Sequence, residues 1–400
     1  MNFVFVSLQR INTDRESTST SLAKELAKKH TVLFVNPPID RKTFLSKNND
    51  HYVEEHIVQI KNGSTGIKKL AENLYMLNTS SLLESINWIP STKVFSLFNY
   101  INNRRFARDI KNSLQELNFE SFILINDKDI FRSFYLKELL RPSLYIYLDR
   151  DYTLGVDYWK RHGANLEPRL IKKSDLVVCN SNDFVKSAKK YNANSFYIGN
   201  GVDLKLFNSD VSHDIPEQLK TLKQPIIGYV GALSSLRLDL NLIVQVATAM
   251  PECSFVLIGK EDKEFSKSVL HEMENVHFLG KIDKKNIPSY VQYFTVCINP
   301  QLLNEITIGN FPLKIVEYLA MGKPVVAKST NTMKEVFSEY SYLADDAQEF
   351  TNLIKKALSD DNSIKHSERI SFAKSFSWDK VVSLLDESIK SSANNNSTLI

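Results

Sequence analysis

The chain has 400 residues, of which 43% are apolar and 24% are charged. That length exceeds one ordinary core, and the composition is typical of globular proteins, so we expect two folded domains. No stretch contains the roughly 18 to 20 uncharged apolar residues that a membrane-spanning helix needs. The start of the chain lacks the basic residues of a signal peptide. Cys179, Cys253 and Cys297 are far apart beside strand-forming residues, which indicates buried thiols, not disulfides or a metal site, and a cytoplasmic protein.

The positive charge is concentrated in the first half of the chain. Residues 1–200 hold 29 lysines and arginines against 21 acidic residues, whereas residues 201–400 hold 21 against 25. The basic half is expected to face an anionic membrane surface, a phosphorylated lipid or an acidic saccharide. Nucleic acid is not expected, because no dense basic and aromatic stripe is present. An unevenly charged, solvated surface remains the other interpretation.

The first half has the pattern of a parallel α/β domain. A strand over 2–8, a helix capped within 17–20 and a strand over 32–35 predict a β-α-β unit. The connection over 9–16 contains no glycine, so a nicotinamide or flavin dinucleotide site is not expected there. Further buried strands are predicted at 73–77, 121–126, 144–148, 175–181 and 195–203.

The stretch 82–106 is rich in apolar and aromatic residues, including Trp88, and ends on Arg104 and Arg105. Such a stretch could contact a membrane surface. Packing in the core is the commoner use of aromatic-rich stretches. Both interpretations stay open.

A polar linker over 208–223 precedes a second α/β series. Its strands are predicted at 225–232, 255–259, 276–280, 295–299 and 324–327. A final helix is expected from about 378 to 389, followed by a tail too polar to pack.

The most specific local pattern is the stretch 311–327. Pro312 suits the first turn of a helix, Gly322 the position just after its end, and the apolar run over 325–327 a buried strand. Free N–H groups at Leu313 and Lys314, the helix dipole and the lysine charge would bind phosphate. Glu317, one turn later, could accept hydrogen bonds from ribose hydroxyls. The alternative is an ordinary surface Lys–Glu pair.

These residues resemble the glycosyltransferases of the GT-B fold. The resemblance covers most of the chain and is carried by the stretches 226–327, Asn200-Gly-Val-Asp203 and Phe372 to Asp379. The stretch 312–324 and Asn36-Pro-Pro38 look most like transferases of bacterial polysaccharide assembly, of the teichuronic acid and xanthan glucuronosyltransferase type.

The resemblance implies an α/β fold of two facing Rossmann-like domains with parallel sheets. It implies an acceptor domain over 1–207, a nucleotide-sugar domain over 208–374, a helix over 375–390 that returns to the first domain, and a disordered tail over 391–400. Family 4 retaining enzymes carry a glutamate eight positions before the one matched by Glu317, where this chain has Gly309. The difference favours the polysaccharide branch.

The resemblance also assigns roles to individual residues. Asp149, at the end of a strand, matches the proposed base of xanthan-type enzymes, and Asp151 is its competitor. The sequence Asp149-Arg-Asp151 could instead hold a metal ion, as the Asp-x-Asp motif does in the other glycosyltransferase fold. We expect no cofactor, because cationic residues and a helix start take the place of the metal in GT-B enzymes. The residues expected to bind the donor are Gly231, Arg237, Lys281, Ile282, Leu313, Lys314 and Glu317.

The sequence thus predicts a transferase that moves a sugar from a nucleotide sugar, with a UDP-sugar as the expected donor, to a surface polysaccharide or lipid-linked saccharide. The alternative is a non-catalytic nucleotide-sugar-binding scaffold of the same fold. The basic first half favours peripheral contact with the inner face of the cell membrane.

Overall fold

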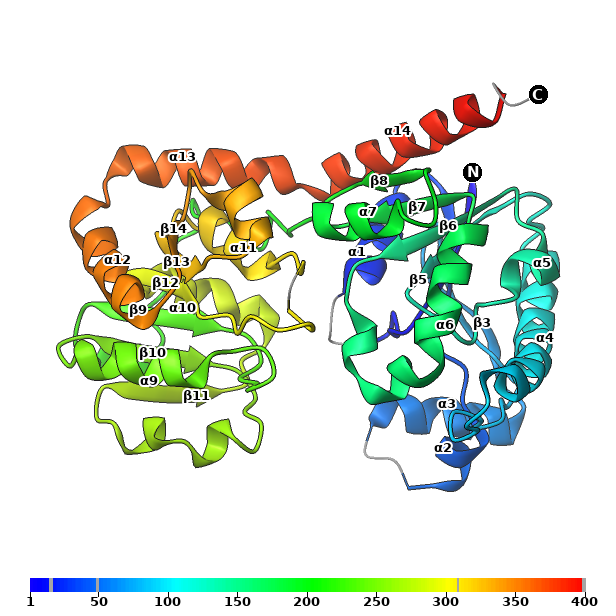
Figure 1. Cartoon of the computed structure of the whole chain (residues 1–400), viewed down its shortest axis with the longest axis horizontal. Coiled ribbons are helices and arrows are strands. Elements are labelled where there is room, and N and C mark those ends of the chain that lie inside the picture. The colour runs from blue at the N-terminus through cyan, green and yellow to red at the C-terminus, as the bar shows by residue number, and fades with distance from the viewer. Residues whose placement is uncertain (14–16, 48–49, 308, 398–400) are drawn as a thin grey trace. The chain divides into compact units, whose positions relative to one another are not determined.

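The computed structural model describes residues 1–13, 17–47, 50–307 and 309–397. The chain divides into two compact units, Met1–Gly199 with Val381–Ile400, and Asn200–Lys380. Each unit is built on one sheet flanked by helices (Figure 1).

The sheet of the first unit has eight strands in the order β3-β4-β2-β1-β5-β6-β7-β8. All neighbours are parallel except the antiparallel pair β3 and β4. The strands are β1 (Asn2–Ser7), β2 (Thr31–Val35), β3 (Gly66–Ala71), β4 (Leu74–Asn78), β5 (Ile123–Asp127), β6 (Leu144–Asp149), β7 (Leu176–Cys179) and β8 (Ser195–Tyr197). The helices are α1 (Thr18–Leu26), α2 (Arg41–Leu45), α3 (His51–Asn62), α4 (Thr92–Glu116), α5 (Leu136–Leu140), α6 (Asp157–Lys173), α7 (Asn182–Ala188) and α14 (Trp378–Ser397), the last beginning in the second unit.

Alternate residues of β1 point into the core of the first unit. Val4 and Val6 of β1 pack in one apolar cluster with Phe106 of α4 and Leu166 of α6. The predicted N-cap of α1 is confirmed, because the Ser17 side chain accepts a hydrogen bond from the backbone of the third helical residue in a capping box. The β-α-β start therefore forms as the periodicity indicates.

Helix α4, which contains much of the aromatic stretch, has both buried and exposed apolar residues. Phe95 and Phe106 are buried in the core, as most aromatic residues are. Leu97, Phe98 and Ile101 on the same helix are exposed. One face of α4 thus packs on the unit, and another face carries apolar side chains that the unit does not cover.

The sheet of the second unit has six strands, all parallel, in the order β11-β10-β9-β12-β13-β14. The strands are β9 (Ile226–Val230), β10 (Ser254–Ile258), β11 (Val276–Gly280), β12 (Val296–Asn299), β13 (Val325–Lys328) and β14 (Tyr342–Ala344). The helices are α8 (Glu217–Lys220), α9 (Leu240–Ala249), α10 (Ile287–Tyr293), α11 (Leu313–Ala320), α12 (Ala347–Asp360) and α13 (Ser363–Ala373).

Two apolar clusters cover the two faces of this sheet. Ile226 of β9 belongs to the cluster that contains α10 and α11, and its neighbour Ile227 to the cluster that contains α9 and α12. Both faces of the parallel strands are therefore buried, which explains why they read as continuous apolar runs.

The unit boundary falls at Gly199 and Asn200, earlier than the expected boundary at 207 and 208. The N–H of Val202 donates to the carbonyl oxygen of Phe376 at 2.9 Å, and Phe207 lies in the core of the second unit. The side chain of Trp378 lies so close to Gly201 that a Cβ atom there would be 2.4 Å from the indole ring. These contacts tie residues 200–207 to the second unit.

Helix α14 continues to Ser397, beyond the expected end of the helix, and residues 398–400 of the expected tail lie outside the described residues. The hydroxyls of Ser388 and Ser391 donate to backbone carbonyls one turn earlier, so these polar side chains are satisfied within the helix. Ser392 is buried, with its hydroxyl 3.4 Å from the carbonyl oxygen of Asp175. Within the described ranges, no helix is both long enough and apolar enough to cross a bilayer.

Candidate active site

The end of β9 and the start of α11 are held together in the second unit. The Lys314 ammonium donates a hydrogen bond to the Tyr229 hydroxyl at 2.6 Å and lies 4.2 Å from the centre of that ring. The Tyr318 hydroxyl accepts a hydrogen bond from the N–H of Val230 at 2.8 Å. Two tyrosines thus fix the first turns of α11 against the carboxyl end of a central strand, where ligands bind in open α/β sheets.

Gly231 follows β9 where the chain has no room for a side chain. Its φ of 147° lies outside the range that other residues favour, and an added Cβ atom would lie 2.9 Å from the Lys314 ammonium. A Cβ atom at Gly259 would lie 1.8 Å from the Gly231 carbonyl oxygen. The two glycines let backbone approach Lys314 closely, as a diphosphate site requires.

The loop after Gly231 is held by the segment after β12. The carbonyl oxygen of Arg237 accepts from the N–H of Leu302, and that of Leu236 accepts from the Asn304 side chain, both at 2.9 Å. The Arg237 side chain itself is exposed. Its backbone is fixed while its guanidinium is accessible to a ligand.

The other predicted donor residues divide into two groups. Leu313 and Glu317 lie on α11 with Lys314 and are half-buried. Lys281 and Ile282 follow β11, which is two strands from β9 in the sheet order. Lys281 is exposed, and Ile282 packs against the core. The structure brings Gly231 together with Lys314, and the roles of the remaining residues stay predictions.

Asn299, the last residue of β12, was missed by the sequence analysis. Its side chain is buried, and its Nδ2 atom has no hydrogen-bond partner among the described residues. A buried donor without a partner is costly. The only available sequence indication was an asparagine at the end of a predicted strand.

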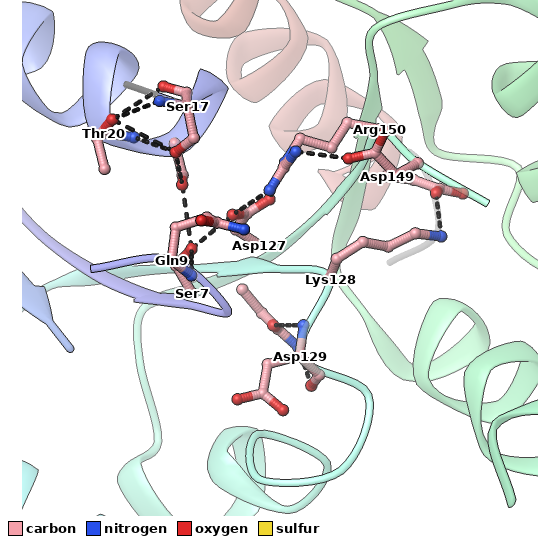
Figure 2. Close-up of polar contacts among 12 residues, drawn as sticks. Ser7, Gln9, Ser17, Thr20, Asp127, Lys128, Asp129, Asp149 and Arg150 are labelled. Carbon is pink, nitrogen blue, oxygen red and sulfur yellow. Dashed lines mark hydrogen bonds and ion pairs between the residues drawn. The ribbon is translucent and has the colours of Figure 1, made fainter. Parts of the chain in front are cut away.

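In the first unit, the carboxyl ends of β5 and β6 carry a buried ion pair between Asp127 and Arg150 (Figure 2). The Arg150 guanidinium donates to Asp127 Oδ1 at 2.6 Å and to Oδ2 at 3.1 Å. The Ser7 hydroxyl also donates to Asp127 Oδ2, at 2.6 Å. Burial alone would raise the pKa of Asp127, but the charge of Arg150 and these hydrogen bonds outweigh it and lower the pKa. Asp127 is therefore a structural anion that fixes Arg150.

A second buried cluster surrounds the predicted base, Asp149. The Lys128 ammonium donates to Asp149 Oδ1 and to Glu167 Oε1, each at 2.5 Å. The Tyr147 hydroxyl donates to the same Glu167 oxygen at 2.7 Å. Burial, which is the largest effect, and the nearby Glu167 charge raise the pKa of Asp149 to about 6, although Lys128 opposes the rise.

Asp149 and Asp151 thus have different surroundings. Asp149 is almost fully buried, and no hydrogen bond among the described residues reaches its Oδ2 atom. The Asp151 side chain is 39% exposed and pairs with Arg150 at 2.6 Å. Asp149 has the perturbed pKa expected of a base, whereas Asp151 is the more accessible carboxylate.

In the described part of the chain, no three His, Cys, Asp or Glu side chains are grouped so as to hold an ion. Asp127-Lys-Asp129 repeats the Asp-x-Asp sequence of Asp149-Arg-Asp151. Asp127 pairs with Arg150 and Asp129 with Arg132. The sequence analysis assigned no role to Lys128, although it directly follows a buried strand. Its φ of 58° is left-handed, a strained conformation typical of functional sites.

Each of the two units is an α/β domain built on a mainly parallel sheet, which is the architecture that the GT-B resemblance implies. Residues 224–360 match the family model described as glycosyl transferases group 1, so the second unit carries a domain of that family. The predicted resemblance and fold class are confirmed.

Among curated proteins, the chain is similar to the putative teichuronic acid biosynthesis glycosyltransferase TuaH of Bacillus subtilis (strain 168). The two are 28% identical over 182 residues, which are 44% of this chain and 46% of that protein. The match therefore spans about half of the relative's length.

Two solved structures show the same fold over the whole chain. Sucrose-phosphate synthase from Thermosynechococcus elongatus has a TM-score of 0.69 at 17% identity, with 98% of each chain covered. HepE from Anabaena, solved in complex with UDP, has a TM-score of 0.65 at 16% identity, with 98% of this chain and all of that chain covered.

We predict that Lys128→Met destabilises the protein by about 3 to 5 kcal/mol at neutral pH, because it leaves Asp149 and Glu167 buried without their cation. Urea unfolding followed by circular dichroism measures the loss. The matched control is Lys137→Met, which breaks the half-exposed pair with Asp175 and is expected to cost less than about 1 kcal/mol. Equal losses in the two variants would contradict the structural role given to Lys128.

Proposed function

We propose that the protein transfers a sugar from a UDP-sugar to a growing polysaccharide or a lipid-linked saccharide. The observation that carries the proposal is the cationic start of α11, where Lys314 lies beside Gly231. The names of the similar proteins support it, since HepE was solved with UDP and with UDP-glucose, and the Bacillus subtilis protein is named for teichuronic acid biosynthesis. A non-catalytic nucleotide-sugar-binding scaffold is the alternative.

The donor diphosphate binds at the first turn of α11 in this proposal. The N–H groups there and the positive end of the helix dipole attract phosphate, and Lys314 adds a full charge. The N–H of Leu313, expected to be free, donates to the carbonyl oxygen of Phe311 at 3.1 Å and would exchange that contact for a phosphate oxygen. In the structure, the Lys314 ammonium donates a hydrogen bond to the Tyr229 hydroxyl. When the donor binds, the ammonium can donate to a phosphate oxygen instead. Glu317, one turn later, accepts from the ribose. These groups stabilise the leaving nucleoside diphosphate without a divalent cation.

The acceptor hydroxyl loses its proton to Asp149 in this proposal. Lys128 holds Oδ1 and leaves Oδ2 without a hydrogen bond among the described residues, so Oδ2 is the atom that takes the proton. A pKa of about 6 leaves the carboxylate ionised at neutral pH and still basic enough to act.

We expect Lys314→Ala and Glu317→Ala to weaken UDP binding, because each removes a charged hydrogen-bonding group worth roughly 1.5 to 3 kcal/mol, or about 10- to 150-fold in Kd. Isothermal titration calorimetry measures the affinity. Lys356→Ala, an exposed lysine on α12, is the control and should bind UDP as the wild type does. Unchanged affinity in Lys314→Ala would remove α11 from the donor site.

Asp149→Asn is expected to abolish turnover of a UDP-sugar while retaining UDP affinity, and Asp151→Asn to retain most of the activity. Because protonated Asp149 cannot accept a proton, kcat/KM of the wild type should rise as pH increases through about 6. Turnover should persist in EDTA. Loss of activity in Asp151→Asn alone, or activity restored only by Mn²⁺, would contradict these assignments. If the wild type binds UDP-sugars but shows no turnover, the result would support the alternative of a non-catalytic scaffold.

Helix α4 supports contact with a membrane as part of the proposal. Leu97, Ile101, Arg104, Arg108 and Lys111 recur every three or four residues and therefore share one face of the helix. The first two are exposed apolar residues. The cations line a groove of about 500 Å³ whose lining contains no acidic residue. An apolar segment followed by cations is suited to the surface of an anionic bilayer.

We expect the full-length protein to sediment with vesicles containing anionic lipid, and to do so less in roughly 0.5 M salt, because basic residues contribute about 1 kcal/mol each and salt screens them. Arg104→Glu with Arg108→Glu should reduce the bound fraction. Lys189→Glu with Lys190→Glu, an exposed pair after α7 with the same change in charge, is the control. Equal binding to neutral and anionic vesicles would contradict the electrostatic contact.

A further inference from the structure

The first unit contains a pocket at the carboxyl edge of its sheet. Its volume is about 530 Å³, within the roughly 300 to 1,000 Å³ of small-molecule sites. Its walls come from the segments that follow β2, β4, β5 and β6 and from the start of α4. Ligands bind at this edge of parallel sheets, and neither the donor site nor the proposed base occupies this pocket.

Aromatic rings form much of the lining. Phe131 and Trp159 are stacked with centroids 5.1 Å apart, and Tyr158 meets the Trp159 ring edge-on at the same distance. Trp88, at the rim, is 72% exposed. Exposed aromatic rings around a cavity offer flat apolar surfaces to a ligand.

Hydrogen bonds within the protein hold the residues around Trp88, at the rim of the pocket, in place. The Trp88 indole N–H donates to the carbonyl oxygen of Ser85 at 2.8 Å. The Asn87 amide donates to the carbonyl oxygen of Tyr158 at 2.9 Å, and Arg161 donates to that of Asn87 at 3.1 Å. Because the indole donor is already satisfied, Trp88 presents its ring to a ligand and not its polar atom.

The polar groups of the pocket are balanced in charge and mostly paired. Arg132 pairs with Asp129, and Glu84 pairs with Arg41 and Arg105. Asp157 at the start of α6 is exposed, and Asn87 Oδ1 is a buried acceptor with no partner among the described residues. The pocket therefore favours a neutral ligand with apolar faces and hydroxyl donors over a strongly charged one.

We infer that this pocket binds one or two pyranose units of a neutral saccharide, stacked on Trp88 and the Tyr158–Trp159 pair. Pyranose rings combine C–H faces, which pack on aromatic rings, with hydroxyls that can donate to Asp157, which lines the pocket and is exposed. Naming this saccharide as the acceptor rests on the proposed function. The binding of the saccharide itself does not.

Intrinsic fluorescence tests the inference directly, because two of the three tryptophans, Trp88 and Trp159, line the pocket, and the third, Trp378, packs on Gly201. The full-length protein is titrated separately with maltose, cellobiose, lactose and N,N′-diacetylchitobiose. At least one should change the fluorescence saturably, with the change retained in Trp378→Phe. Trp88→Ala should weaken that binding about tenfold or more, as loss of an aromatic anchor does.

Two controls make the result specific. Tyr191→Ala, an exposed aromatic residue outside the lining, should leave saccharide binding unchanged. UDP affinity, measured by calorimetry, should be unchanged in Trp88→Ala; failure of UDP to bind the wild type would refute the proposed function and not the saccharide pocket. No response to any of the four sugars, or an equal response in Trp88→Ala, would overturn the inference. Loss of vesicle binding but not of sugar binding in Trp88→Ala would assign the residue to a lipid surface and also overturn it.

Discussion

The contact of Lys314 with Tyr229 and Gly231 is the interaction on which the donor side of the account depends. A lysine at the first turn of a helix adds its charge to the positive end of the helix dipole, an arrangement that is unfavourable until an anion is bound. Tyr229 holds the ammonium at 2.6 Å, and Gly231 leaves no side chain between it and the end of β9. The start of α11 therefore has excess positive charge, and Gly231 leaves room beside that charge. A diphosphate site requires both features.

In the first unit, the carboxyl edge of the sheet contains several buried charged side chains. Lys128 lies between Asp149 and Glu167, and Arg150 neutralises Asp127. Buried ion pairs of this kind contribute little net stability, since desolvation offsets the attraction. They do fix the positions and the protonation of the carboxylates. A catalytic role for Asp149 explains the presence of this costly cluster better than stability does.

The pattern of elements could be predicted from the sequence where local chemistry determines it. Ser17 begins α1, and Gly322, with a φ of 69°, follows α11 in the left-handed conformation that ends many helices. The start of α11 at Leu313 was predicted from Pro312, which is the N-cap residue of the helix and does not lie in its first turn. The parallel strands were recognisable as apolar runs because both of their faces are buried.

The remaining features depend on contacts between residues distant in the sequence. Lys128 meets partners 21 and 39 residues away, and the aromatic pocket joins segments that follow four different strands. The exposed face of α4 could not be distinguished from its buried face, because both carry apolar residues. The boundary at Gly199 depends on the packing of Trp378 on Gly201. The part of α14 beyond its expected end includes Ser392, which is buried with its hydroxyl near the carbonyl oxygen of Asp175. The polar composition of these segments does not reveal either contact.

The central claim is that the start of α11 binds the diphosphate of a UDP-sugar, and a crystal structure of the full-length protein with UDP tests it most directly. We expect phosphate oxygens within about 2.7 to 3.1 Å of the Lys314 ammonium and of N–H groups in the first turn of α11, with the Lys314–Tyr229 hydrogen bond broken or shared. UDP bound elsewhere, with the first turn of α11 unoccupied, would contradict it.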